Sequence, residues 1–202
     1  EHPILGSAQL GMSMCPGRNK KKKTHIWKRD LQTDLQVIQR SGAQVLLTLV
    51  RSSELLAMDI MEIFVRAKQL GLETVHFPVP DKWIPDSMTQ VVELVRKLLV
   101  WVKAGRKIAI HCNGGKGRTG MVVVATLFAL GLPVDEAIHS VRKRRKGMIR
   151  NPAQIVYVKL FETRWKNENP SWKPWIPVAD TAVVDRLLEE EEHWERKHNK
   201  GS

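Results

Sequence analysis

The 202-residue sequence predicts an α/β fold, in which a central, mostly parallel β-sheet is flanked by helices and followed by a C-terminal helical extension. The first observation behind this prediction is an alternation along the chain. Short apolar runs, typical of buried parallel strands, alternate with longer segments of helical periodicity. Such alternation favours a parallel sheet, because parallel neighbours need a crossover connection. The second observation is a glycine-rich stretch, residues 111–120, between a predicted strand and a predicted helix.

Composition divides the chain into three regions. Residues 1–28 form an N-terminal segment with a basic loop, and no regular element is expected over 12–18. Residues 29–166 form one domain. Residues 167–202 form a connector rich in proline and tryptophan, followed by a helix expected over 181–198. No apolar run approaches the ~20 residues that a membrane-spanning helix needs, so no transmembrane segment is expected.

The first half of the domain begins with an amphipathic helix. Leu31, Leu35 and Ile38 recur on one face of this helix, which ends at Gly42. The almost wholly apolar run that follows is typical of a buried parallel strand. The elements expected in this half are a helix over 29–40, a strand over 43–50, a helical stretch over 52–69 that breaks near Met58, and a strand over 72–79.

The second half repeats the alternation of helix and strand. Its strongest signal is an amphipathic helix whose inward stripe is formed by Val91, Leu94, Val95, Leu98 and Val102. Later in the chain, Asn151 and Pro152 mark the start of another helix. The elements expected in this half are a helix over 87–104, a strand over 107–110, a helix over 121–130, a helix over 134–146 and a helix from 152 onward.

The glycine-rich stretch reads His111-Cys-Asn-Gly-Gly-Lys-Gly-Arg-Thr-Gly120. A loop that opens a helix points its free backbone N–H groups at one spot, and the helix dipole adds partial positive charge there. Cys112 lies at the start of this anion cradle and Arg118 at its end. This spacing lets the loop wrap a tetrahedral oxyanion while the Arg118 fork holds two oxygens. Such surroundings favour a nucleophilic thiolate, so the stretch predicts a phosphate site with a covalent nucleophile.

Two other interpretations of this stretch are weaker. A structural cysteine beside a glycine-rich turn is disfavoured, because His-Cys-x5-Arg-Thr-Gly stands between a strand and a helix. A nucleotide-binding loop is disfavoured, because Gly-x4-Gly-Lys-Ser/Thr is absent. Phosphate-ester cleavage also needs an acid for the leaving oxygen. Asp81 is the candidate, since residues 80–87 leave the carboxyl end of a predicted strand. Asp86 is expected to cap the next helix.

These residues resemble the signature of the cysteine-based protein tyrosine and dual-specificity phosphatases. Lys116 also makes the loop similar to that of the tensin-related phosphoinositide phosphatases. Over residues 4–165 the chain resembles the kinase-associated phosphatase (cyclin-dependent kinase inhibitor 3) family in particular, which implies a single phosphatase domain. The segments that carry this resemblance are Cys15-Pro-Gly-Arg18, Arg29–Asp34, Glu54-Leu55, His76–Asp81 and Ile138–Tyr157.

The resemblance implies a catalytic role for three residues. Cys112 would attack phosphorus and form a cysteinyl-phosphate. Arg118 and the N–H groups of the loop would stabilise the equatorial oxygens of the transition state. Asp81 would protonate the leaving oxygen and then take a proton from water. The expected phosphate-binding residues are Asn113, Gly114, Gly115, Lys116, Gly117 and Arg118.

The resemblance also implies supporting roles. Thr119 would donate a hydrogen bond to the Cys112 sulfur and ease its departure. Gln154 would help to place the water of the second step. His111, beside the nucleophile in the strand, would hold the loop rather than transfer protons. No metal or other cofactor is expected.

Three functions stay open. The first is a metal-independent phosphomonoester hydrolase that acts on phosphotyrosine or on phosphoserine and phosphothreonine in proteins. The second is a phosphoinositide phosphatase, which Lys116 and the nearby Lys82 favour because they add positive charge around the loop. The third is a protein that docks a kinase or another phosphoprotein, with catalysis secondary.

Net charge and cysteine content indicate the partners and the compartment. The formal net charge of +12 favours an acidic partner, here a phosphorylated protein such as a protein kinase, or an anionic phosphoinositide. No nucleic acid partner is expected. The two cysteines, Cys15 and Cys112, do not indicate a disulfide scaffold. A nucleophilic Cys112 must stay reduced, so a cytoplasmic or nuclear setting is expected. The lysine run 20–23 is interpreted as a solvated face, with a nuclear signal as the alternative.

Overall fold

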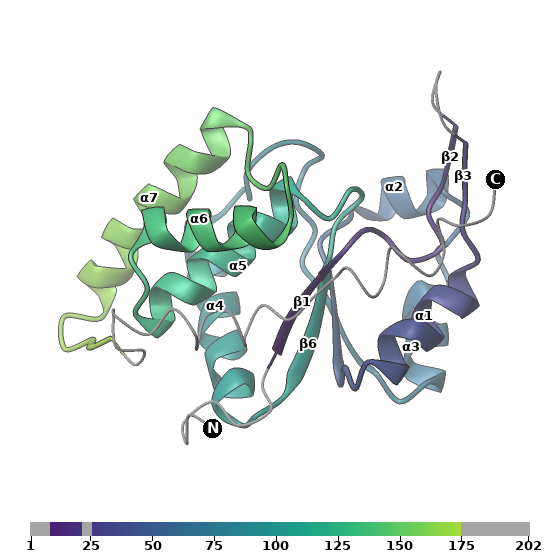
Figure 1. Ribbon diagram of the computed structural model, residues 1–202, viewed down its shortest axis with the longest axis horizontal. Helices are drawn as coiled ribbons and strands as arrows, with labels where there is room; N and C mark the ends of the chain where they lie inside the picture. Colours follow the sequence, from purple (N-terminus) through teal and green to yellow (C-terminus); the bar gives the residue numbers. More distant parts are fainter. Residues whose placement is uncertain (1–8, 22–25, 175–202) are drawn as a thin grey trace.

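Four parallel strands form the central sheet of the protein, which a computed structural model describes over residues 9–21 and 26–174 (Figure 1). The prediction of an α/β fold with a mostly parallel sheet is confirmed, since all three strand pairings in this sheet are parallel. In spatial order the strands are β1 (Gln9–Ser13), β6 (Lys107–His111), β4 (Val45–Thr48) and β5 (Glu73–His76). A separate antiparallel hairpin consists of β2 (Asn19–Lys21) and β3 (Ile26–Lys28).

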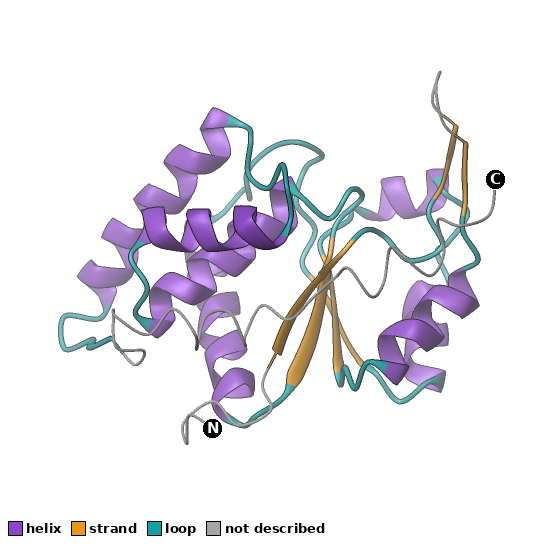
Figure 2. Ribbon diagram, in the orientation of Figure 1, coloured by secondary structure: helices purple, strands orange, loops and turns teal. Residues whose placement is uncertain are grey.

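Helices cover both faces of the sheet (Figure 2). Helices α1, α2 and α3 lie on one side, and α4 to α7 lie on the other. In chain order the helices are α1 (Leu31–Arg40), α2 (Ser52–Ala57), α3 (Ile63–Gln69), α4 (Met88–Lys103), α5 (Gly117–Leu130), α6 (Val134–Arg144) and α7 (Pro152–Glu168). No helix of the described residues is both long and apolar enough to cross a bilayer.

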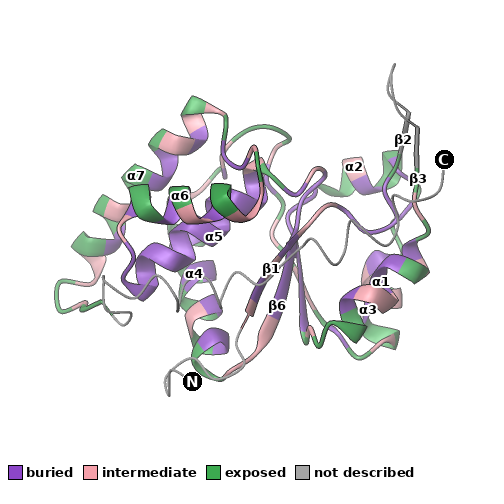
Figure 3. Cartoon of the chain, in the orientation of Figure 1, coloured by how far each residue is buried: buried purple, intermediate pink, exposed green. Residues whose placement is uncertain are grey.

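The two central strands, β4 and β6, are buried on both faces, which explains their apolar runs. Successive strand residues point to opposite faces of a sheet. Leu47 and Ile110 therefore join the core beneath α4 and α5, whereas Leu46 and Ala109 join the core beneath α1 and α3. Helix α5 follows the glycine-rich loop and is buried along nearly its whole length, between α4, α6 and α7 (Figure 3). This enclosure fixes the start of α5, and with it the loop.

The N-terminal part of the chain differs from the prediction. A strand, β1, occupies Gln9–Ser13, although no regular element was expected over 12–18. This strand pairs in parallel with β6 and forms an edge of the main sheet. Its signal in the sequence is short: only Leu10 and Met12 are buried, and Gly11 and Ser13 alternate with them. An edge strand with one buried face is a weak pattern compared with the continuous apolar run of β4.

One helix cap also differs from the prediction. Ser87, not Asp86, caps α4: the Ser87 hydroxyl accepts a hydrogen bond from the Gln90 N–H group, and Asp86 instead faces Arg51 at 3.4 Å. At the other end of the domain, the helix expected from 152 onward is α7, which ends at Glu168. The helix expected over 181–198 lies outside the described residues.

The segment after α7 returns to the domain. Trp172 donates a hydrogen bond from Nε1 to the Ala129 carbonyl over 2.9 Å, and its ring lies 5.2 Å from the ring of Phe128. The connector therefore starts as a packed segment against the end of α5.

Candidate active site

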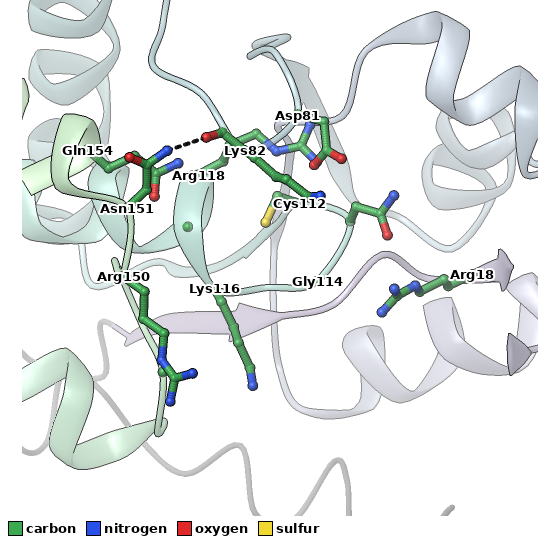
Figure 4. A pocket seen from close by; sticks show the side chains of 13 residues that line it. Arg18, Asp81, Lys82, Cys112, Gly114, Lys116, Arg118, Arg150, Asn151 and Gln154 are labelled. Carbon is green, nitrogen blue, oxygen red and sulfur yellow. Dashed lines mark hydrogen bonds and ion pairs between the residues drawn. The ribbon is translucent and has the colours of Figure 1, made fainter. Parts of the chain in front are cut away.

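The carboxyl ends of the four sheet strands lie side by side, and the loops that follow them build the site. The register pairs Ser13 with His111, His111 with Thr48, and Thr48 with His76. Loops that leave this edge of an open parallel sheet meet over it. A cavity of about 470 Å³ opens there (Figure 4). The predicted site residues that line it are Asp81, Cys112, Asn113, Gly114, Lys116, Gly117, Arg118 and Gln154.

Cys112 lies in this cavity because it directly follows β6. The loop from Cys112 to Lys116 joins that strand to α5, whose first turn begins at Gly117. Cys112 is buried, with its sulfur at the cavity. The free N–H groups at the start of a helix form a ready binding site for an anion. The loop therefore has the strand–loop–helix arrangement that the sequence predicted.

Two glycines of the loop make close approaches that a side chain would prevent. Gly115 has a φ angle of +62°, and a Cβ atom there would overlap the Ser13 carbonyl group. Gly115 thus rests on the end of β1 and does not itself line the cavity. At Gly117, a Cβ atom would lie 2.7 Å from Oε1 of Gln154. The loop is therefore held between β1 on one side and α7 on the other.

Arg118 is fixed by two carboxylates. Its guanidinium donates to Glu54 over 2.7 and 3.0 Å, to Asp81 over 2.8 Å and to the Val79 carbonyl over 3.0 Å. Burial lowers the pKa of Arg118, but its hydrogen bond to Glu54 and the nearby negative charges outweigh burial and leave the pKa raised. Burial likewise raises the pKa of Glu54. The hydrogen bond and charge of Arg118, with hydrogen bonds from Arg51 and Asn113, together outweigh burial and leave that pKa lowered. Both groups are charged at neutral pH, so the guanidinium is fixed before any anion binds.

Asp81, the candidate acid, reaches this guanidinium from the loop that follows β5. Its side chain is 45% exposed, while that of Arg118 is 2% exposed. In this structure the carboxylate of Asp81 accepts a hydrogen bond from Nη2 of Arg118, a group that a bound phosphate is also predicted to use. A phosphate that enters the cavity therefore competes with Asp81 for Arg118.

Two side chains from the start of α7 hold the loop that carries Asp81. Asn151 donates from Nδ2 to the Lys82 carbonyl over 2.7 Å, and Gln154 donates from Nε2 to the Trp83 carbonyl over 2.9 Å. Gln154 was predicted to place a water molecule. Its amide nitrogen holds the loop, and its Oε1 atom faces the Gly117 side of the cavity, so the predicted role stays a prediction.

His111 and Thr119 flank the loop without lining the cavity. His111 is buried, and its Nε2 atom lies 2.8 Å from Oγ1 of Thr48. Burial lowers the pKa of His111 to about 3, so the imidazole is neutral at pH 7 and suits the predicted supporting role. The Oγ1 atom of Thr119 is buried and has no hydrogen-bond partner among the described residues. The hydrogen bond predicted from Thr119 to the Cys112 sulfur is therefore not present in this structure.

Sequence reasoning missed the structural roles of Glu54, Arg150 and Asn151. Glu54 reads as an ordinary charged residue of a short helix, and only the family resemblance singled it out. Arg150 and Asn151 precede α7, and their sequence signal indicates no more than a helix start. These residues meet the site only because separate loops converge at the sheet edge. The described residues contain no cluster of three or more His, Cys, Asp or Glu that could hold a metal ion.

Comparison with known proteins places the chain in a family. The family model for cyclin-dependent kinase inhibitor 3 (CDKN3) matches residues 4–138. The chain belongs to this family. Cyclin-dependent kinase inhibitor 3 from Rattus norvegicus is 30% identical over 158 residues, which cover 77% of this chain and 72% of that relative. The resemblance that the sequence suggested is confirmed.

Solved structures of related proteins share the fold. Kinase associated phosphatase, with its catalytic-site cysteine substituted by serine, has a TM-score of 0.70 and 28% identity, and the match covers 77% of this chain and 86% of that one. Tk-PTP in its active form has a TM-score of 0.63 and 29% identity, with 81% and 99% covered. These relatives confirm the predicted enzyme class, a cysteine-dependent protein phosphatase of the dual-specificity or tyrosine type. The roles of individual residues stay predictions.

Proposed function

We propose that this member of the CDKN3 family hydrolyses phosphate monoesters on protein side chains through a cysteinyl-phosphate on Cys112. The observation that carries the proposal is that Cys112, Arg118 and Asp81 line one cavity at the start of a helix. Together they supply a nucleophile, a fixed positive charge and a proton donor. Phosphate-ester cleavage needs these three components.

In the first step, the Cys112 sulfur forms a bond to phosphorus while the bond from phosphorus to the substrate oxygen breaks. Asp81 donates its proton to that leaving oxygen. The guanidinium of Arg118 and the loop N–H groups stabilise the charge on the three equatorial oxygens. Glu54 supports this step through Arg118, because its two short hydrogen bonds set the orientation of the guanidinium before the substrate arrives.

In the second step, a water oxygen forms a bond to phosphorus while the sulfur–phosphorus bond breaks. Asp81, now ionised, takes a proton from that water, and the Cys112 thiolate is restored. Oε1 of Gln154, on the Gly117 side of the cavity, is placed to accept a hydrogen bond from the water. The products are inorganic phosphate and the dephosphorylated protein.

The ion pair between Asp81 and Arg118 gives this mechanism a distinctive feature. When a phosphate replaces the Asp81 carboxylate on Arg118, Asp81 is released beside the leaving oxygen. There it takes up a proton from the solvent and then donates that proton as the acid. Asp81→Asn removes both the acid and the competing charge. We expect kcat to fall by about a hundred- to ten-thousandfold, while the KM does not rise.

A second candidate function is hydrolysis of phosphoinositides. Lys82 and Lys116 both line the cavity, and their charges suit a substrate with several phosphates. Docking without catalysis is less well supported, because the cavity contains all three components of the chemistry.

The test is phosphate release from a phosphotyrosine peptide, a phosphothreonine peptide and soluble phosphoinositides, with Cys112→Ser as the control. We expect release from at least one peptide and none with the variant. Faster release from the inositol compounds than from either peptide would favour the second candidate. No release by the reduced wild-type protein, or release that survives Cys112→Ser, would overturn the proposal.

A further inference from the structure

Basic side chains dominate the cavity around Cys112. The cationic residues that line it are Arg18, Lys82, Lys116, Arg118 and Arg150, and Asp81 is the one carboxylate among the described lining residues. That carboxylate is already paired with Arg118. Cationic side chains therefore outnumber carboxylates among the described residues that line the cavity.

Two of these cations, Lys116 and Arg150, lie on one flank of the cavity. Figure 4 shows both side chains extending to the same side of the loop, away from Cys112 and Asp81. Both residues are exposed. Neither side chain makes an ion pair or a hydrogen bond within residues 9–21 and 26–174. Like charges on one flank of a cavity repel each other, and an anion bound at that flank relieves the repulsion.

The backbone that carries Arg150 is held firmly. Arg142 donates from Nε to the Met148 carbonyl over 3.2 Å and from Nη2 to the Ile149 carbonyl over 2.7 Å. Ile149 has a φ angle of +43°, a costly conformation for a β-branched residue that persists only where the surroundings impose it. The following residue, Asn151, is tied to the loop that carries Asp81. The backbone of Arg150 is thus fixed, while its side chain has no ion pair or hydrogen bond within the part of the chain that the structure describes.

We propose that Lys116 and Arg150 form a second anion subsite, which binds another phosphate on the same peptide segment as the phosphate that Cys112 attacks. This inference rests on the proposed function and names its substrate class: a protein segment phosphorylated at two neighbouring residues. A phosphate carries about −1.5 to −2 charges at pH 7, which two cations balance. The planar guanidinium of Arg150 can hold two of its oxygens at once.

The depth of the two positions favours a peptide over an inositol ring. Cys112 is buried at the bottom of the cavity, whereas Lys116 and Arg150 are exposed at its rim. Two side chains of one extended peptide can reach different depths independently. The phosphates of an inositol ring are held at fixed positions on a small rigid body.

The experiment compares peptides of one sequence that carry a phosphotyrosine alone or together with a phosphothreonine one, two or three positions to either side. For wild type, we measure kcat/KM on each peptide and the Kd of each peptide for the inactive Cys112→Ser protein. We expect a preference of about tenfold or more for one doubly phosphorylated spacing in both measurements, as a charge-assisted hydrogen bond allows. Arg150→Gln should remove most of this preference.

Lys146→Gln is the matched control. Lys146 belongs to the same segment, is exposed, and does not line the cavity, and its replacement removes the same charge. We expect this variant to keep the preference. An equal loss in Lys146→Gln and Arg150→Gln would show an effect of net charge and would overturn the subsite. A wild-type protein without any preference would overturn it too.

The two readouts separate this inference from the proposed function. Absent phosphate release, together with a binding preference that Arg150→Gln abolishes, would overturn the proposed function and leave the subsite supported. Normal release at equal efficiency from singly and doubly phosphorylated peptides would overturn the subsite and leave the proposed function supported. A soluble inositol bisphosphate that is hydrolysed more than about tenfold better than every doubly phosphorylated peptide would overturn the assignment to a peptide.

Discussion

His111 should make the protein sensitive to mild acid, and the structure gives the size of the effect. The imidazole is buried beside Thr48, and its pKa falls from 6.5 to about 3 on folding. Between these two values the unfolded chain binds a proton that the folded protein excludes. The stabilisation that comes from keeping His111 neutral is therefore complete above about pH 6.5 and is lost as the pH falls toward 3.

The slope is about 1.4 kcal/mol for each pH unit in that window. From pH 7 to pH 5, His111 should therefore lower the free energy of unfolding by about 2 kcal/mol. His111→Asn removes the titrating group and keeps a polar side chain that can still bond to Thr48. We expect the variant to be less stable than wild type at pH 7 but to lose about 2 kcal/mol less than wild type between pH 7 and pH 5.

Urea denaturation of both proteins at the two pH values measures this difference. His139→Asn is the control, because it removes a solvent-exposed imidazole and should leave the pH dependence of wild type unchanged. Equal losses of stability in wild type and His111→Asn would refute the reasoning. In that case, proton uptake by His111 would not differ between the folded and unfolded states.

Three other predictions concern two groups that hold the site and one that anchors the connector. Glu54→Gln removes one of the two carboxylates on Arg118, so we expect about 2 kcal/mol less stability in urea and a roughly tenfold lower kcat/KM on a phosphopeptide. Gly115→Ala forces a Cβ atom into the Ser13 carbonyl group at a positive φ angle, so urea denaturation should show a loss of more than ~1 kcal/mol. Trp172→Phe keeps an aromatic ring but loses the indole N–H group and its hydrogen bond, which should cost about 1 kcal/mol.

Each of these predictions has its own control or contrary result. Gly114→Ala is the matched control for Gly115, because a Cβ atom at Gly114 meets nothing within 4 Å. Equal losses from the two glycine variants would contradict the role of β1 as a support. Full activity in Glu54→Gln would show that Arg118 needs no second carboxylate. An unchanged stability in Trp172→Phe would show that the connector is not anchored through its indole.

The nucleophile loop was predictable from the sequence because its chemistry is local. Cys112 and Arg118 lie on one short stretch, and the strand before it and the helix after it have strong apolar patterns of their own. A strand, a loop of fixed length and a helix leave little freedom in how the loop is folded. The amphipathic stripe of α4 was predictable for a similar reason, since helical periodicity depends only on neighbouring turns.

Competition between adjacent residues limited the prediction at one helix end. Asp86 and Ser87 are both good capping residues, and their order alone does not decide which one caps. In the structure, Ser87 caps α4 and Asp86 turns toward Arg51. The choice depends on the path of the preceding loop, which is set by its contacts with α7.

The sequence by itself determined the fold class, the nucleophile loop and the position of Asp81 after a strand. Only the tertiary structure decided that Glu54 and Asp81 share Arg118, that Asn151 and Gln154 hold the loop around Asp81, and that Arg150 lines the same cavity as Lys116. The physical reason is that an apolar pattern specifies which face of each element is buried. It does not specify which loops meet at the edge of the sheet, because that depends on strand order and register, and these are fixed only when the whole core packs.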